Sequence, residues 1–242
     1  MDQAVYFDYQ KGRSREGPQA LLATYQGYLQ ADGYKVYEDF DTKAHPNITL
    51  LQCMAHARRK FVEALANDQA RAQHALDWIG KLYGIEKQCR LLKNELTLQE
   101  WYDQRQEIRQ VQAVPVLEEI NKWLIEQAAI VLPKSAIGKA IDYSLRRWAI
   151  LSRYVKDGRL EIDNNLVENQ IRPVALGRKN FLFAGSHQAA SRAAVIYSMV
   201  ATCNKAGIDP EKWLTDVLTK LPSRKANDID DLLPQNWMAK ND

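Results

Sequence analysis

Two acidic side chains stand where carboxylates could do metal chemistry. Asp32 follows the short apolar stretch "YLQA" and precedes Gly33, and Glu168 lies within "LEIDNNLVENQIRP", residues 160–173. Hard cations such as Mg²⁺ bind one or two carboxylates and keep positions open for phosphate oxygens. Two such ions about 4 Å apart can activate an attacking oxygen and stabilise a leaving one. The two acids are far apart in the sequence, so spacing alone does not bring them together.

Both acids also have purely structural interpretations. Asn165 followed by Glu168 matches a capping box at a helix start. Glu168 with Arg172 is a favourable i,i+4 ion pair on a helix. Asp32 with Gly33 is a strong turn signal, because glycine tolerates positive φ and aspartate caps its own turn. Local pattern alone favours these structural interpretations over a metal site.

The segment "CMAHARRKF" raises two further alternatives. Cys53 and His56 have the C-x-x-H spacing of zinc ligands, but no second pair lies at a suitable distance along the chain. We therefore expect Cys53 to end a buried strand and His56 to start a helix. Arg58, Arg59 and Lys60 form either a solvated face or a contact to a DNA backbone.

Composition indicates a globular protein with a full core. The chain has 242 residues, of which 46% are hydrophobic and 26% charged. A net charge of +3 does not by itself indicate a polyanionic partner, but basic residues cluster in "KGRSR", "HARRK", "LRR" and "GRK". Three widely spaced cysteines favour a reducing cytoplasm over a disulfide framework. We find no leader and no apolar run long enough for a membrane span, and expect a cytoplasmic protein.

The first third of the chain predicts short strands and the middle predicts helices. "AVYFDY" at 4–9, "YLQADGY" at 28–34 and "NITLLQC" at 47–53 favour strands, and Pro18 opens a helix over 18–28. From about 54 to 154 the periodicity is helical, and Pro115 and Pro133 divide this block into about four helices.

The last third predicts helices. One helix passes through Glu168, and an extended turn is expected within "LGRKNFLFAGS". A periodic helix then ends at Gly207, and Asp209 with Pro210 begins the last helix. The simplest fold class for this order is α/β, with a helical insertion that interrupts the core.

Five segments together resemble a known family. They are "LQADGY", "CMAHARRKF", "EIDNNLVENQIRPVALGRKNFLFAGS", "AAVIYSMVATCNKAGIDPEKWLTDVL" and "DLLPQNW", and in this order they resemble the C-terminal part of IS66-family insertion-sequence transposases. The resemblance implies a DDE transposase with an RNase H-like core. We then expect strands 3 to 5 of that core, a large all-α insertion and C-terminal helices. The implied division is 1–53 and 157–220 for the core, 54–156 for the insertion and 221–242 for a polar tail.

The resemblance also implies roles for individual residues. Asp32 matches the family's second aspartate and Glu168 its glutamate, so both would hold Mg²⁺, with Mn²⁺ as a substitute, for DNA strand cleavage and transfer. Asp163, Asn164 and Asn165 would orient a carboxylate or contact a phosphate. Arg172, Arg178 and Lys179 match basic positions of the motif and are assigned to the DNA backbone or to balancing the acidic site. Arg58, Arg59 and Lys60, a run of cations within a segment that resembles the family, are expected to join them at the DNA backbone.

One part of the family pattern is missing from this sequence. The family's first aspartate belongs to an Asp-Glu-Thr motif, which does not occur in these 242 residues, nor do the second strand, the zinc-binding segment or the N-terminal DNA-binding region. Asp2 and Asp8 do not match the missing position. We expect "AVYFDY" to lack its ladder neighbours and to expose an apolar edge. Without the bridging aspartate, this polypeptide alone is expected to be inactive as a transposase, as a truncated or split copy.

Three function classes remain open. Two of them involve DNA, and the third is a helical scaffold without a DNA role. The first is a DDE transposase fragment that acts on the element ends and target DNA, and forms a homo-oligomer when complete. An upstream transposase fragment or accessory transposition proteins would be further partners, with no membrane involved. The second is a non-catalytic module for DNA binding or transposase assembly, in which Asp32 and Glu168 are vestigial. Salt-dependent DNA binding without Mg²⁺-dependent nicking would favour the second.

Overall fold

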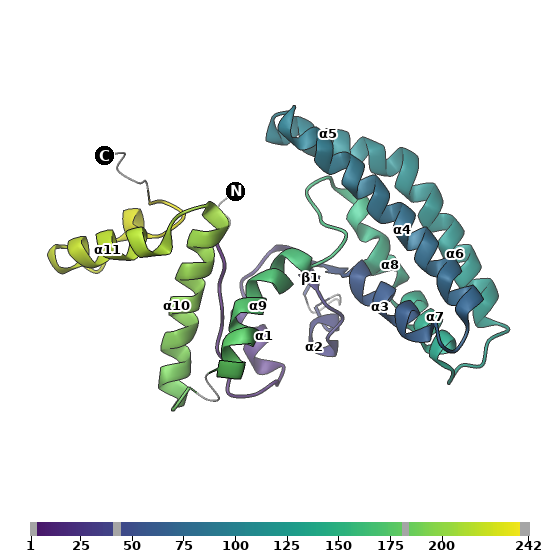
Figure 1. Ribbon diagram of the computed structural model, residues 1–242, viewed down its shortest axis with the longest axis horizontal. Coiled ribbons are helices and arrows are strands. Elements are labelled where there is room, and N and C mark those ends of the chain that lie inside the picture. The colour runs from purple at the N-terminus through teal and green to yellow at the C-terminus, as the bar shows by residue number, and fades with distance from the viewer. Residues whose placement is uncertain (1–3, 41–44, 181–183, 238–242) are drawn as a thin grey trace. The chain divides into compact units, whose positions relative to one another are not determined.

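The chain divides into two compact units (Figure 1). The computed structural model describes residues 4–40, 45–180 and 184–237, apart from the side chain of Arg178. We call Pro18–Asn165 the central unit, and Met1–Gly17 together with Leu166–Asp242 the terminal unit. The helix α1 (Glu16–Leu21) spans the division and is shorter than the predicted 18–28, because the next strand already begins at Gly27.

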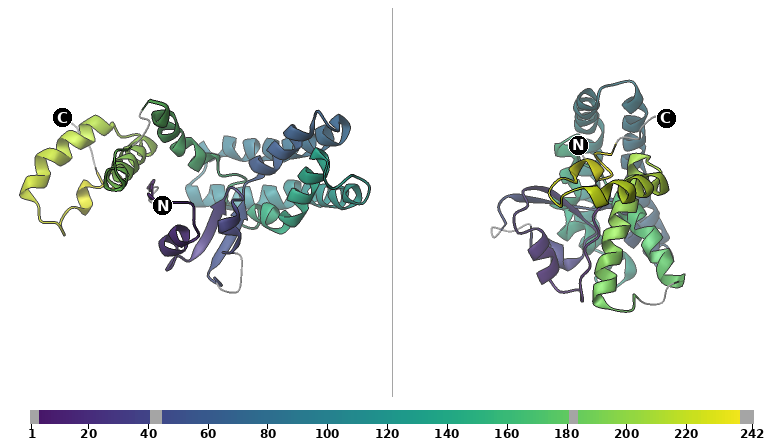
Figure 2. Two further views of the ribbon diagram at one scale, coloured as in Figure 1. Left: turned by 90° about the horizontal axis from the view of Figure 1, so that it is seen from below. Right: turned by 90° about the vertical axis from the view of Figure 1, so that its left-hand side faces the viewer.

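A parallel pair of strands lies in the central unit. β1 (Gly27–Ala31) pairs with β2 (Ile48–Gln52) in a register that runs from Gly27 opposite Ile48 to Ala31 opposite Gln52. Figure 2 shows the two strands side by side as arrows. The connection between them contains α2 (Lys35–Glu38). Buried residues lie on both faces of β2, as expected for a covered parallel strand, whereas β1 is more exposed. Both strands were predicted from the sequence.

Helices make up the rest of the central unit, as the sequence predicted for residues 54 to 154. Helix α3 packs against α4 and α7, and α6 packs against α4 and α7; α4 and α6 run side by side in Figure 1. Buried apolar residues from these four helices form one core, which also includes Leu51 of β2. The elements are α3 (Met54–Ala64), α4 (Gln69–Leu91), η1 (Leu92–Asn94), α5 (Leu98–Ile108), η2 (Arg109–Ala113), α6 (Val114–Ala128), α7 (Ala136–Arg146), α8 (Trp148–Leu151) and η3 (Ser152–Lys156).

Pro115 does not divide the helical block, so this prediction was wrong. The chain stays helical from α5 through η2 into α6, and η2 is a single π-helical turn. Pro115 lies in the first turn of α6, directly after the π turn. A π turn already interrupts the regular i→i−4 ladder, so a residue without an N–H is tolerated next to it.

The described part of the terminal unit contains α9 (Asn165–Asn180) from its second residue on, α10 (His187–Ala206) and α11 (Pro210–Lys220), with the short turns η4 (Leu221–Ser223) and η5 (Asp230–Leu232). Gly207 ends α10 at a φ of 71°, and its N–H donates to Asn204 O. Asp209 caps α11, which starts at Pro210. The predicted helix end at Gly207, the cap at Asp209 and the helix start at Pro210 are thus confirmed. The extended turn predicted within 176–186 was wrong over 176–180, where α9 continues; residues 181–183 lie outside the described residues.

The predicted strand at 4–9 was also wrong. Residues 4–10 have no regular secondary structure. The backbone N–H of Val5 donates to Thr202 Oγ1 at 2.9 Å, and that of Phe7 donates to Ser198 Oγ at 2.8 Å. Hydroxyl groups of α10 thus satisfy amides that a sheet ladder would otherwise use, since a strand requires a partner strand. The sheet of the described residues is two-stranded, which is compatible with an α/β class. The RNase H-like core and the division into four parts remain predictions.

In the part of the chain that the structure describes, no helix is both long enough and apolar enough to cross a membrane.

Candidate active site

Asp32 lies directly after the carboxyl end of β1, and its side chain is exposed. Its Oδ1 accepts the backbone N–H of Tyr34 at 2.9 Å, and Gly33 has a φ of 89°. The turn interpretation of Asp-Gly is therefore confirmed. It does not exclude a ligand role, because among the described residues Oδ2 has no hydrogen bond and no ion pair.

The carboxyl ends of the two strands meet around Cys53. The backbone N–H of Cys53 donates to Ala31 O at 3.1 Å, and the backbone N–H of Asn164 contacts Cys53 Sγ at 3.5 Å. Cys53 is buried between β2 and α3, and His56 lies in the first turn of α3, as the structural interpretation predicted. Burial raises the pKa of the Cys53 thiol, and this favours a neutral thiol at neutral pH.

The segment that leads into α9 runs past the same strand ends. Gln30 Nε2 donates to Glu161 O at 2.9 Å, and the backbone N–H of Met54 donates to Ile162 O at 3.1 Å. Asp163 then accepts two hydrogen bonds from Asn165 at the start of α9. Its Oδ1 accepts from the backbone N–H at 3.0 Å, and its Oδ2 accepts from the side-chain amide at 2.8 Å. The helix start is therefore tied to a fixed loop of the central unit.

Tyr83 of α4 contacts Asp163 from another helix, and no pattern in the sequence predicted this contact. Tyr83 Oη donates to Asp163 Oδ2 at 2.8 Å. Burial, and then the bond to Asp163, raise the pKa of Tyr83 far above its ordinary range, so the phenol stays a donor. Asp163 therefore accepts three hydrogen bonds, from Tyr83 and from the backbone and side chain of Asn165.

A cluster of buried charges holds the loop before this segment; we call Glu86, Arg105, Arg109 and Glu161 the buried ion cluster. Glu86 Oε2 accepts from Arg105 Nη2 at 2.7 Å, and Glu86 Oε1 accepts from Arg109 Nε at 2.7 Å. These three side chains are fully buried. Arg105 Nη2 also pairs with Glu161 Oε2 at 2.7 Å.

The two arginines of the cluster also donate to backbone carbonyls of the loop. Arg109 donates to the carbonyls of Tyr154, Asp157 and Leu160 at 2.8–3.0 Å. Arg105 donates to Gly158 O at 3.1 Å. The helical insertion thereby fixes the chain that runs toward Asp163. Buried ion clusters have no local sequence signal, so sequence reasoning missed this one.

Glu168 lies in the first turn of α9. Arg172 and Lys179 follow on the same helix and are exposed, whereas the side chain of Arg178 lies outside the described residues. Asp32 and Asp163 to Asn165 belong to the central unit, and Glu168 with these basic residues belongs to the terminal unit.

The basic run of α3 is open to solvent. Arg58 and Arg59 are exposed, and Lys60 Nζ pairs with Glu63 Oε2 at 2.9 Å. Exposed pairs of this kind contribute at most about 1 kcal/mol, so they leave a cation available to other anions.

The residues around Asp32 fit part of the coordination of a hard cation. Asp32 supplies an exposed carboxylate, and the side-chain amide of Gln52 is buried without a hydrogen-bond partner in the described residues. Gln52 Oε1 lies against Gly33, at 3.5 Å from where a Cβ would stand. Buried polar atoms without partners usually bind ordered water. Mg²⁺ in proteins binds through one or two carboxylates and keeps several waters, so an amide oxygen without a partner beside one carboxylate is compatible with it.

Comparisons with known proteins show the family of the chain. The sequence matches "Transposase IS66 family" over residues 1–192 and "IS66 C-terminal element" over residues 198–235. It is similar to two proteins of Sinorhizobium fredii. The uncharacterized protein y4hP is 37% identical over 250 residues, which cover 97% of this chain and 44% of y4hP. The uncharacterized protein y4jD is 33% identical over 244 residues, which cover 98% of this chain and 46% of y4jD.

The chain thus spans less than half the length of these relatives. No solved structure matches it. The family match covers residues 1–192 of 242 and includes both Asp32 and Glu168, and the chain therefore belongs to the IS66 family of transposases.

Proposed function

We propose that this chain carries part of a DDE-type centre that cuts and joins DNA strands during transposition. The observation that carries the proposal is the position of Asp32, an exposed carboxylate at the carboxyl end of a parallel strand, in a chain of this family. Asp32 and Glu168 would hold the divalent cations. When bound, Mg²⁺ or Mn²⁺ would activate the attacking oxygen and stabilise the leaving one.

The other residues of the proposed centre position these carboxylates or the DNA. Asp163 and Asn165 fix the start of the helix that carries Glu168 one turn later. Arg172, Arg178 and Lys179 on that helix, and Arg58, Arg59 and Lys60 on α3, would contact DNA phosphates. Such contacts place the strand and carry no sequence information. The core around these residues is proposed to be RNase H-like.

We further propose that these 242 residues alone do not cut DNA. They contain no Asp-Glu-Thr motif, and removal of one member of a catalytic group that acts as a unit abolishes nearly all activity. Element ends and target DNA are the proposed substrates. A homo-oligomer of the longer protein and accessory transposition proteins are its proposed partners.

The second candidate is a non-catalytic module for DNA binding or transposase assembly. Exposed cations on α3 and α9 favour it, since they are available to a polyanion whether or not the acids bind metal. The two candidates differ in one result, which is whether nicking depends on Mg²⁺ and on the two acids.

The test is nicking of a plasmid that carries the element ends, in Mg²⁺ and in EDTA. It compares this chain with a longer polypeptide that includes the Asp-Glu-Thr motif. We expect cutting only by the longer polypeptide with Mg²⁺. Asp32→Asn or Glu168→Gln in that polypeptide should reduce the rate about a thousandfold or more. Asp77→Asn, an exposed acid on α4, is the matched control and should cut normally.

Cutting by the longer polypeptide that survives Asp32→Asn and Glu168→Gln would reject the proposed ligands. Salt-dependent DNA binding without any Mg²⁺-dependent cutting would support the binding module instead.

A further inference from the structure

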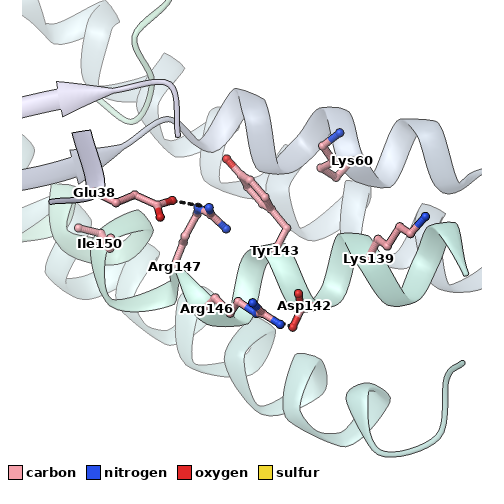
Figure 3. Close-up of a pocket in the computed structure, with 8 residues that line it drawn as sticks. All are labelled: Glu38, Lys60, Lys139, Asp142, Tyr143, Arg146, Arg147 and Ile150. Atoms are coloured by element: carbon pink, nitrogen blue, oxygen red, sulfur yellow. Dashed lines mark hydrogen bonds and ion pairs between the residues drawn. The ribbon is translucent and has the colours of Figure 1, made fainter. Parts of the chain in front are cut away.

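A pocket of about 530 Å³ lies on the central unit beside α3 and α7 (Figure 3). Four basic side chains line it, Lys60 of α3 and Lys139, Arg146 and Arg147 in and after α7, together with two acidic ones. We call it the basic pocket. Because α3 packs against α7, basic clusters that lie far apart in the sequence meet here.

Arg147 is the fixed cation of the basic pocket. Figure 3 shows its side chain between Glu38 and Tyr143. Arg147 Nη2 forms an ion pair with Glu38 Oε1, and the guanidinium lies 4.3 Å from the centre of the Tyr143 ring. The side chain is only 19% exposed, and its Nε is buried without a partner in the described residues. A guanidinium held in this way needs little further ordering to bind an anion.

The other three cations are held weakly. Arg146 pairs with Asp142 at 2.8 Å, but the two side chains are 73% and 53% exposed. Lys60 pairs with Glu63, also in the open, and Lys139 has no ion pair in the described part of the chain. Exposed pairs contribute about 0–1 kcal/mol, so an incoming phosphate can replace the acidic partner at little cost.

Tyr143 connects the basic pocket to Asp32. A Cβ added to Gly33 would stand 2.5 Å from Tyr143 Oη, so the tyrosine hydroxyl lies against the Asp32–Gly33 turn. One side of Tyr143 therefore faces Arg147 and its tip faces the turn that carries the proposed metal ligand. A phosphate chain bound in the pocket would lie next to Asp32.

We propose that the basic pocket binds the phosphate backbone of the DNA substrate beside the Asp32–Gly33 turn, with Arg147 as the fixed contact. Lys60, Lys139 and Arg146 are exchangeable contacts. The proposal rests on the proposed function, and it adds three residues to the DNA surface. Arg147 covers the face of Tyr143, so this ring is not a platform for a base, and contact to backbone phosphates fits the lining better.

The test measures binding of a fluorescein-labelled duplex to the full chain by anisotropy, without Mg²⁺, over a series of salt concentrations. The pocket variant is Lys139→Gln with Arg146→Gln, because both side chains are exposed and their loss should leave the melting temperature unchanged. We expect weaker binding, and a slope of log Kd against log salt that falls by about one per phosphate contact removed.

The matched control is Lys81→Gln with Lys122→Gln, which removes the same charge from exposed positions on α4 and α6. It should keep both affinity and slope. Arg147→Gln should weaken binding further, and Arg147→Lys should restore only part of it, because lysine lacks the planar fork.

Two results would overturn the proposal. One is an equal effect of the pocket and control variants on DNA affinity. The other is no effect of the pocket variant on either the affinity or the salt slope. DNA binding is measured without metal and without cutting. The binding result therefore tests the basic pocket even if the nicking test rejects the proposed metal ligands.

Discussion

Arginine has opposite roles in two regions of the central unit. In the buried ion cluster, Arg105 and Arg109 are fully buried and bind two glutamates and four backbone carbonyls. In the basic pocket, Arg146 is 73% exposed and has one weak pair. A guanidinium whose donors are all taken by the protein cannot bind a ligand, whereas one in the open can exchange its partner. The comparison separates cations that hold the chain from cations that are available to DNA.

The largest expected effect is that of Glu86→Gln in the buried ion cluster. It leaves the buried Arg109 guanidinium without an ion pair among the described residues, and it leaves Arg105 with only the partly exposed Glu161. Loss of one partner from a buried ion pair reduces the free energy of unfolding by about 3–5 kcal/mol. Urea denaturation measures this, with the exposed Glu107→Gln on α5 as the control. An effect as small as that of the control would remove the distinction between the two regions.

A smaller loss of unfolding free energy is expected for Gly33→Ala, in the turn after β1 that Tyr143 of the basic pocket contacts. The new Cβ would stand 2.5 Å from Tyr143 Oη, at a φ of 89°. Such backbone strain costs about 1–3 kcal/mol, and a displaced Tyr143 should also weaken DNA binding. Gly80→Ala inside α4 is the matched control, since nothing lies within 4 Å of its Cβ, and it should stabilise by about 0.5–1 kcal/mol. Equal unfolding free energies for the two variants would contradict the contact.

Acid should unfold the protein partly through Glu86. Burial alone would raise its pKa, but Arg109 and Arg105 outweigh burial and hold it below the ordinary 4.5. A group whose pKa is lower in the folded state contributes stability above the unfolded pKa and loses it as the pH falls through the folded pKa. We expect the unfolding free energy to fall below about pH 4.5, and less steeply in Glu86→Gln. Parallel pH profiles for the two proteins would argue against this coupling.

The smallest expected effect is the change in stability of Arg146→Ala. Its pair with Asp142 is exposed on both sides, so the free energy of unfolding should change by less than about 0.5 kcal/mol. The same variant should lower DNA affinity at low salt. Thermal melting and anisotropy on one preparation measure both. A large loss of stability would mean that Arg146 holds the chain, as Arg105 does.

Features with local causes were predictable from the sequence. The ends at Gly207 and Asp209 follow from side-chain and backbone preferences within a few residues, and β1 ends at Asp-Gly as expected. The strand predicted at 4–9 failed because a strand depends on a partner elsewhere, and here α10 bonds the amides.

Long-range groupings were not predictable. The family resemblance assigned roles to Asp32 and Glu168, and the local run of cations assigned one to Lys60. No sequence pattern pointed to Tyr83, Gln52 or Arg147. Each of these three side chains contacts a residue that is distant in the sequence, which is Asp163 for Tyr83, Gly33 for Gln52 and Glu38 for Arg147. Only the contacts of the folded chain identify them.

The π turn of η2 sets the phase between the two halves of a long helix. Buried residues recur at every fourth position through it, at Trp101, Arg105, Arg109, Ala113 and Leu117. In a straight α-helix, four such steps would rotate the buried stripe by about 160°. One extra residue in the π turn cancels about 100° of that rotation. Removal of a single residue between Arg109 and Ala113 would therefore convert the π turn to a regular α-helical turn and keep the two halves of the stripe in phase. The turn behaves as a one-residue insertion that the helix absorbs without rotating its buried face.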